Sequence, residues 1–160
     1  MMHTWFTCKI CYEKTLENGM NKKVTEPYLV DALSFTEAEA RIIEEMTPYI
    51  SGEFTVADVT RARYSELFFV EDDINASYWY KVKLGFVTLD EKSGSEKKTY
   101  TNVLVQSTDL RQAVKDLDEG MKGSMADYII VSVAETAIMD VYPYEADPDV
   151  KPEFPDPLSE

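Results

Sequence analysis

The chain has 160 residues, of which 44% are hydrophobic and 12% aromatic, which excludes a disordered chain and predicts a sizeable core. No run approaches the about 18 apolar residues of a membrane span, so we expect no membrane contact. Thirty acidic against sixteen basic residues give a net charge of −14. Bulk attraction of phosphates is therefore excluded, and any contact with nucleic acid must rest on a local basic patch.

The amino terminus leads directly into a predicted strand. Hydrophobic and more polar residues alternate from Phe6 to Tyr12, which is typical of a strand buried on one face. Asn18-Gly19 predicts a hairpin turn, and residues 24–30 predict the returning strand. Because no signal peptide precedes this pattern, we expect a cytoplasmic protein.

A helix is predicted after this hairpin. Ser34 and Glu37 have the spacing of a capping box and precede an apolar stripe at helical spacing, typical of a helix that covers a sheet. Residues 54–59 and 61–70 predict a third and a fourth strand. Residues 1–70 therefore form a β-β-α-β-β unit.

The same pattern returns after an acidic linker at residues 71–77 and fills residues 78–144. Aligned pairs are Trp5 with Trp79, Lys9 with Lys83, Val56 with Val131 and Ala62 with Ala137. The offset changes by one residue at the hairpin turn and then persists through helix and strand. We predict an α+β fold made by tandem duplication, with antiparallel sheets each covered by one helix. The two copies would be related by a pseudo-two-fold and packed as one globular body, either as a monomer with an internal pseudo-dimer or as a weak homodimer.

Residues 145–160 form an acidic, proline-rich tail, which we expect to be extended. Phe154 lies among acidic residues, as in tails that recruit a protein partner through an apolar anchor. A solubilising tail with no partner is the alternative interpretation.

Candidate metal and catalytic residues are few. Cys8 and Cys11 have C-x-x-C spacing, but three residues along a strand place the thiols on opposite faces, which disfavours a zinc or redox site. Asp72 and Asp73 in the linker could hold magnesium, although a solvated linker is the simpler interpretation. His3 is the only histidine. We therefore expect no metal, no cofactor and no enzymatic activity, with a metal-dependent hydrolase as a distant third hypothesis.

The outward faces of the predicted strands carry the main functional hypothesis. Each face combines a tryptophan with basic side chains, an arrangement that grips single-stranded nucleic acid by stacking and by phosphate contacts. The predicted site residues are Trp5, Lys9, Arg61, Arg63, Trp79, Lys81, Lys83 and Tyr100. The alternative is a protein-interaction or structural scaffold, because such tryptophans also cover core edges and such cations also protect edge strands.

The stretch WFTCKICYEKTLENGMNKKVTEPYLVDALSFTEAEARI, from Trp5 to Ile42, resembles a known family. It is similar to domain of unknown function 4494, found in gut bacteria and their phages, and the resemblance extends to about Tyr142. The family brings no catalytic residue. Its occurrence in phage genomes implies a role around DNA replication, which agrees with the single-strand hypothesis.

Overall fold

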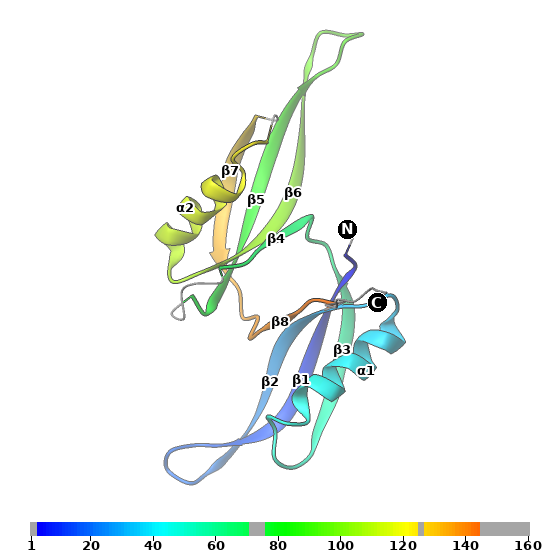
Figure 1. The fold of residues 1–160 in the computed structure, drawn as a ribbon, viewed down its shortest axis with the longest axis vertical. Coiled ribbons are helices and arrows are strands. Elements are labelled where there is room, and N and C mark those ends of the chain that lie inside the picture. The colour runs from blue at the N-terminus through cyan, green and yellow to red at the C-terminus, as the bar shows by residue number, and fades with distance from the viewer. Residues whose placement is uncertain (1–2, 71–75, 125–126, 145–160) are drawn as a thin grey trace, which may run out of the picture. The chain divides into compact units, whose positions relative to one another are not determined.

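The structure is a computed structural model that describes residues 3–70, 76–124 and 127–144. Strands and helices follow one another in the order predicted from the sequence (Figure 1). The elements are β1 (Trp5–Thr15), β2 (Asn21–Asp31), α1 (Phe35–Met46), β3 (Phe54–Ala62), β4 (Glu66–Phe68), β5 (Tyr78–Leu89), β6 (Glu96–Ser107), α2 (Leu110–Gly120), β7 (Tyr128–Glu135) and β8 (Val141–Tyr142). The predicted α+β class is confirmed.

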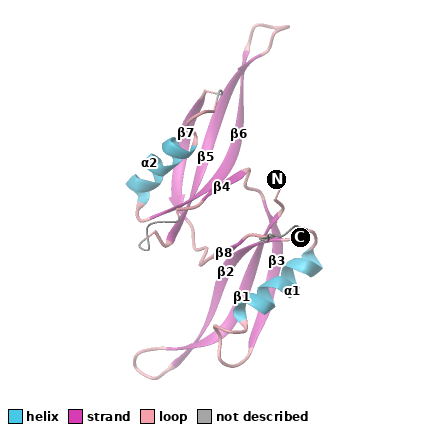
Figure 2. Cartoon of the chain, viewed as in Figure 1, coloured by secondary structure: helices cyan, strands magenta, loops and turns pink. Residues whose placement is uncertain are grey.

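The strands form two four-stranded sheets, each with one helix on one face (Figure 2). The strand order is β3-β1-β2-β8 in the first sheet and β4-β6-β5-β7 in the second. The three long strands of each sheet are antiparallel, as predicted. However, β8 pairs with β2 in parallel, and β4 pairs with β6 in parallel. The prediction of fully antiparallel sheets was therefore wrong at one edge of each.

The fourth strand of each sheet comes from the other half of the sequence. One compact unit comprises the chain up to Ala62 together with the residues from Asp140 onward, and the other comprises Arg63–Met139. The units therefore divide the chain differently from the sequence repeats. Only three residues link Ala62 of β3 to Glu66 of β4, so the two strand ends lie at most four Cα steps, roughly 14 Å, apart. The free position beside β2 lies three strand spacings, also roughly 14 Å, from β3, so only a fully extended connection would reach it. The chain instead completes the second sheet and not its own.

Each helix begins at a side-chain cap. Ser34 Oγ accepts a hydrogen bond from the backbone N–H of Glu37 at 3.1 Å, while Glu37 Oε1 accepts one from the backbone N–H of Leu33 at 2.6 Å. Asp109 Oδ1 accepts from the backbone N–H of Gln112 at 2.8 Å. These bonds satisfy N–H groups that a helix start leaves without partners. The predicted helix starts are confirmed.

Each unit has its own hydrophobic core between helix and sheet. The buried members are Phe6, Cys8, Ile10, Val30, Ala32, Ala38, Ile42 and Met46 in the first unit, and Tyr80, Val82, Leu84, Val103, Val105, Ala113 and Leu117 in the second. The alternating strand residues and the helical stripes anticipated these positions.

A β-bulge lies at the same place in both sheets. Ala57 is the extra residue on β3, next to the residue that pairs with Lys9 on β1. Val131 is the extra residue on β7, next to the residue that pairs with Lys83 on β5. The pairing registers therefore make Lys9 equivalent to Lys83, as the sequence alignment predicted.

The bulge reverses the alternation of side chains on β3 and β7. Arg61 pairs with Phe6, so it lies on the helix side of the sheet, exposed near its edge. The prediction that Arg61 faces outward was therefore wrong. Val56 is equivalent to Ile130 and not to Val131, because α2 is one residue shorter than α1 and the original offset returns before the third strands. The bulge therefore explains the error at Arg61, and the helix length explains the misalignment of Val56.

Candidate binding face

Each sheet has an open face, which we define as the face turned away from its helix. Trp5 and Trp79 lie on the open faces, as predicted, but their exposed fractions are only 4% and 2%. The Trp5 ring stacks on His3 with centroids 5.3 Å apart, and the Trp79 ring meets Phe69 edge-on at the same distance. The prediction that both tryptophans are available for stacking was therefore wrong. Contact with other rings removes these large apolar surfaces from water.

The structure divides the predicted site residues between the two units. The first unit holds Trp5, Lys9 and Arg61, and the second holds Arg63, Trp79, Lys81, Lys83 and Tyr100. The β5–β6 register places Lys81, Lys83 and Tyr100 on one open face of the second unit. The Tyr100 side chain is 54% exposed. Of the predicted aromatic platforms, only Tyr100 is accessible.

Tyr100 lies across a glycine. Gly85 is its register partner, and a Cβ built on Gly85 would stand 3.4 Å from Tyr100 Cε1 and 3.2 Å from Ile129 Cγ1. The missing side chain thus lets the tyrosine ring rest close to the sheet. Lys83 Nζ lies 4.9 Å from the centre of the ring, a cation–π contact on an exposed ring.

Exposed apolar residues lie on the same open face as this ring, and we call them together with Tyr100 the Tyr100 patch. Its members are Val87, Leu89, Tyr100, Ile129 and Val131. Ile129 and Val131 are 48% and 45% exposed, and both face outward beside Gly85. Sequence reasoning missed them, since the alignment of Val131 with Val56 placed Val131 on the core face.

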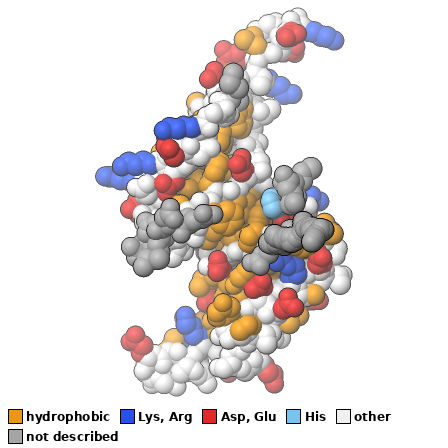
Figure 3. Space-filling model, viewed as in Figure 1, with side chains coloured by type: hydrophobic (Ala, Val, Ile, Leu, Met, Phe, Trp, Pro, Cys, Tyr) orange, Lys and Arg blue, Asp and Glu red, His pale blue; other side chains and the backbone are white. Residues whose placement is uncertain are grey.

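The open face of the second unit is also locally basic. Lys81, Lys83 and Lys98 all point outward, and their register partners are uncharged. Glu96, at the far end of β6, is the only outward-facing acidic residue on the described long strands β5, β6 and β7. Elsewhere, acidic and basic side chains are scattered among hydrophobic ones over the surface in view (Figure 3). The open face of the second unit is therefore positively charged, although the whole chain has a net charge of −14.

The open face of the first unit has a different character. Lys9 stands opposite Asp58, and Lys23 stands opposite Glu13, so each lysine has an acidic register partner. Thr25 occupies the position equivalent to Tyr100. Two faces with the same backbone thus carry different chemistry, and only the second combines an exposed ring with unbalanced lysines.

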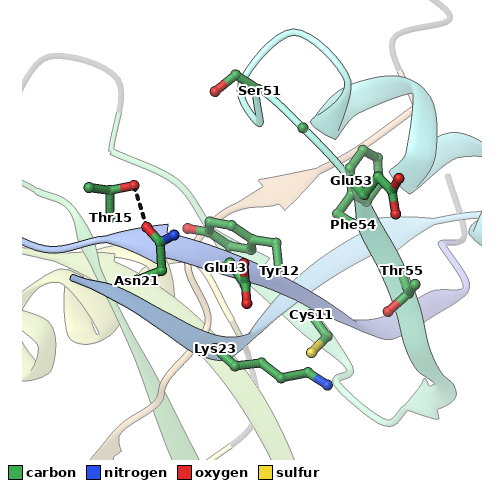
Figure 4. A pocket seen from close by; sticks show the side chains of 11 residues that line it. Cys11, Tyr12, Glu13, Thr15, Asn21, Lys23, Ser51, Glu53, Phe54 and Thr55 are labelled. Atoms are coloured by element: carbon green, nitrogen blue, oxygen red, sulfur yellow. Dashed lines mark hydrogen bonds between the residues drawn. The ribbon is translucent and has the colours of Figure 1, made fainter. Parts of the chain in front are cut away.

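A polar groove of about 560 Å³ lies in the first unit between the β1–β2 hairpin and the loop before β3 (Figure 4). Its walls include the Cys11 thiol, the Lys23 ammonium and the carboxylates of Glu13 and Glu53. In the described ranges, no three histidine, cysteine, aspartate or glutamate side chains are placed to share a metal ion. The groove can offer hydrogen bonds to a polar ligand, but it shows no catalytic arrangement.

The two cysteines lie on opposite faces of β1. Cys8 is buried in the core, and burial, followed by the nearby Glu39, raises the pKa of its thiol to about 11. Such a thiol stays protonated at neutral pH and is a poor nucleophile. Cys11 is half-buried on the open face. The structure therefore agrees with the interpretation of Cys8 as a core residue.

Three predicted features lie outside the described residues: the linker acids Asp72 and Asp73, and Phe154 in the tail. Among the helices that the structure describes, none is both long and apolar enough to cross a membrane.

A family model described as Domain of unknown function (DUF4494) matches residues 4–144. The chain belongs to this family. The resemblance seen in the sequence is therefore confirmed, and the DUF4494 match covers all the strands and helices of both units. No curated protein matches the chain. DUF4494 carries no assigned activity, so the family match gives no role to the open faces.

Proposed function

We propose that this DUF4494 protein is a non-enzymatic module that binds single-stranded nucleic acid on the open face of its second unit. The observation that carries the proposal is the exposed Tyr100 ring with Lys83 Nζ at 4.9 Å, beside two further outward lysines without acidic partners. Aromatic rings among cations on a sheet hold single strands because every base has a face that can stack.

The contacts assign different roles to these side chains. A base would stack on the solvent side of Tyr100 and displace the Lys83 ammonium, which would then contact a neighbouring phosphate. Lys81 is exposed two residues away on β5, and Lys98 is exposed on β6 two residues from Tyr100. These three cations would hold the backbone on either side of the stacked base. The two tryptophans have no part in this arrangement.

The proposal is tested by titrating a labelled oligothymidine with the intact protein and following fluorescence anisotropy. Tyr100→Ala should lower the affinity by about 5- to 150-fold, which corresponds to the roughly 1–3 kcal/mol contributed by one stacked base. Lys83→Ala should lower the affinity and reduce the slope of log K against log salt by about 0.7.

The first unit supplies matched controls. Thr25→Ala and Lys9→Ala change the equivalent positions on the other open face, and both should leave the affinity unchanged. Wild-type protein that does not bind at low salt would refute the proposal. Equal losses for Lys9→Ala and Lys83→Ala would place the binding elsewhere.

A second candidate is a protein partner that docks on the Tyr100 patch. The observation that favours it is the exposure of the apolar side chains of Leu89, Ile129 and Val131 on this face, because apolar side chains do not contact phosphates. Such binding should persist at high salt, whereas binding of nucleic acid should weaken steeply. The salt dependence of binding therefore separates the two candidate functions.

We also infer that the two units arose by tandem duplication. The support is their common strand order, the capped helix in the same place and the bulge opposite equivalent lysines, Lys9 and Lys83. After duplication, one open face could acquire the aromatic and apolar residues while the other kept polar ones. A cytoplasmic location would agree with two free cysteines.

A further inference from the structure

The outer edge of β7 is a strand edge that carries no charged residue or proline from Tyr128 to Ala134, and its one irregularity is the bulge at Val131. β7 ends the second sheet, and within the described residues no strand or loop pairs with its outer side. Edge strands of monomeric proteins are normally short or carry charged residues or proline, because an open edge offers unpaired N–H and C=O groups. β7 therefore has the properties of a strand that pairs with another chain.

The other edges of the two sheets are protected. β3, which holds the equivalent place in the first sheet, carries Asp58 and Arg61. β4 has three residues and β8 has two, so both edges are short. The exposed Ile129 and Val131 thus lie on the one long edge strand of the described sheets whose central residues are uncharged, although β7 shares its bulge with β3.

We propose that β7 pairs antiparallel with β7 of a second copy of this chain, which joins two second-unit sheets into one eight-stranded sheet. The occupant of the edge is the same strand, related by a two-fold axis between the copies. This proposal does not depend on nucleic-acid binding.

The side-chain faces of β7 are self-complementary in one register. If Val131 pairs with Ser132 of the other copy, then Ile130 pairs with Val133, and Ile129 pairs with Ala134. By the β5–β7 register, the first and third pairs are outward on both strands, and the middle pair faces the helix side on both. Apolar residues then meet in the Ile130–Val133 and Ile129–Ala134 pairs, and cross-strand pairs of this kind stabilise a sheet.

Charge does not oppose a second copy at this edge. Each chain carries −14, so two copies repel one another unless the contact itself is uncharged. The central six residues of β7, Ile129–Ala134, satisfy this condition in every pair of the register above. The remaining long-range repulsion is screened by salt over a distance of about 8 Å at physiological ionic strength. Added salt should therefore strengthen the dimer, whereas it would weaken binding of a polyanion.

The test is sedimentation velocity of the full chain over a range of concentrations at low and moderate salt. Wild type should dimerise, and more tightly at moderate salt. Val131→Lys should weaken the dimer at least tenfold, because it brings like charges close together at the centre of the interface, while its exposed position leaves the core intact. The matched control is Ala57→Lys, which adds the same charge at the equivalent bulge of β3 and should dimerise as wild type does.

The register is tested by mixing Val131→Cys and Ser132→Cys chains, each in a Cys11→Ser background, under mild oxidation. A disulfide-linked dimer that contains one chain of each kind is expected. A wild-type chain that stays monomeric at all concentrations overturns the proposal and leaves the edge to a different protein. Equal weakening by Val131→Lys and Ala57→Lys, or the absence of the mixed disulfide despite dimerisation, also overturns it.

Discussion

Gly120 at the end of α2 shows how one missing side chain can fix a packing contact. A Cβ built on Gly120 would stand 2.6 Å from Cδ1 and 2.7 Å from Cε1 of Phe68 on β4, closer than real contacts allow. Its backbone needs no left-handed conformation, since its φ is not positive. Glycine is therefore present here because the Phe68 ring occupies the space, and not because the turn demands it.

Replacement of Gly120 by alanine distinguishes packing from helix propensity. Propensity alone predicts that Gly120→Ala stabilises the protein by up to about 1 kcal/mol. The contact with Phe68 predicts the opposite sign, a loss of about 1–3 kcal/mol, because the ring has to move out of its place. The free energy of unfolding in urea measures the difference. Lys115→Ala, at an exposed position on the same helix, is the control and should change it by less than about 0.5 kcal/mol.

At the scale of elements, the short strand β8 is joined to α1 and β2 by a single arginine of α1. Arg41 Nη1 donates hydrogen bonds to the backbone oxygens of Asp31 and, at 3.4 Å, of Tyr142, while Nη2 donates to the Pro143 oxygen at 3.3 Å. The guanidinium also lies 4.8 Å from the centre of the Tyr144 ring. One arginine thus joins β2, α1 and β8, which has only two residues in its own ladder.

Arg41→Ala should therefore loosen β8 more than any other element. We expect a loss of about 1–3 kcal/mol in the free energy of unfolding, as for hydrogen bonds to a charged group. Hydrogen exchange should become faster at the Leu29 amide, which donates to the Asp140 oxygen at 3.0 Å. Arg111→Ala, at an exposed position on α2, should leave this amide protected. Unchanged exchange at Leu29 in Arg41→Ala would contradict the role given to Arg41.

At the scale of the whole molecule, each unit depends on a strand that the other half of the sequence supplies. Val141 on β8 pairs with Leu29 in the first unit, and Leu67 on β4 pairs with Leu104 in the second. Two connections thus cross between the units, one after β3 and one after β7. The two halves of the sequence are therefore not independent folding domains.

Two reciprocal substitutions test this dependence. Val141→Asp should accelerate hydrogen exchange in β1, β2 and α1, although these elements lie about a hundred residues earlier in the chain. Leu67→Asp should accelerate exchange in β5, β6 and α2. Each change places an unpaired carboxylate among apolar groups and should cost about 2–3 kcal/mol. Peptide-resolved exchange measured by mass spectrometry would contradict the exchanged topology if each substitution affected only its own half of the sequence.

The candidate site was predicted less well than the fold. Lys81, Lys83 and Tyr100 were placed correctly on one face, because two regular strands joined by a tight turn have a fixed register. The tryptophans were assigned to the right face but to the wrong environment, since alternation says which way a side chain points and not what covers it. Ile129 and Val131 could have been suspected only from the unusual run of apolar residues on β7.

The sequence by itself determined the α+β class, the order of strands and helices and the positions of the helix caps. These features depend on residues close together in the chain: alternation in strands, apolar spacing in helices, and caps three residues apart. Only the tertiary structure decided which sheet receives β4 and β8, which side of the sheet Arg61 occupies, and that Trp5 and Trp79 are buried. Strand pairing over long separations depends on the reach of the connections, and a single bulged residue reverses every side chain beyond it. Neither effect leaves a periodic trace in the sequence.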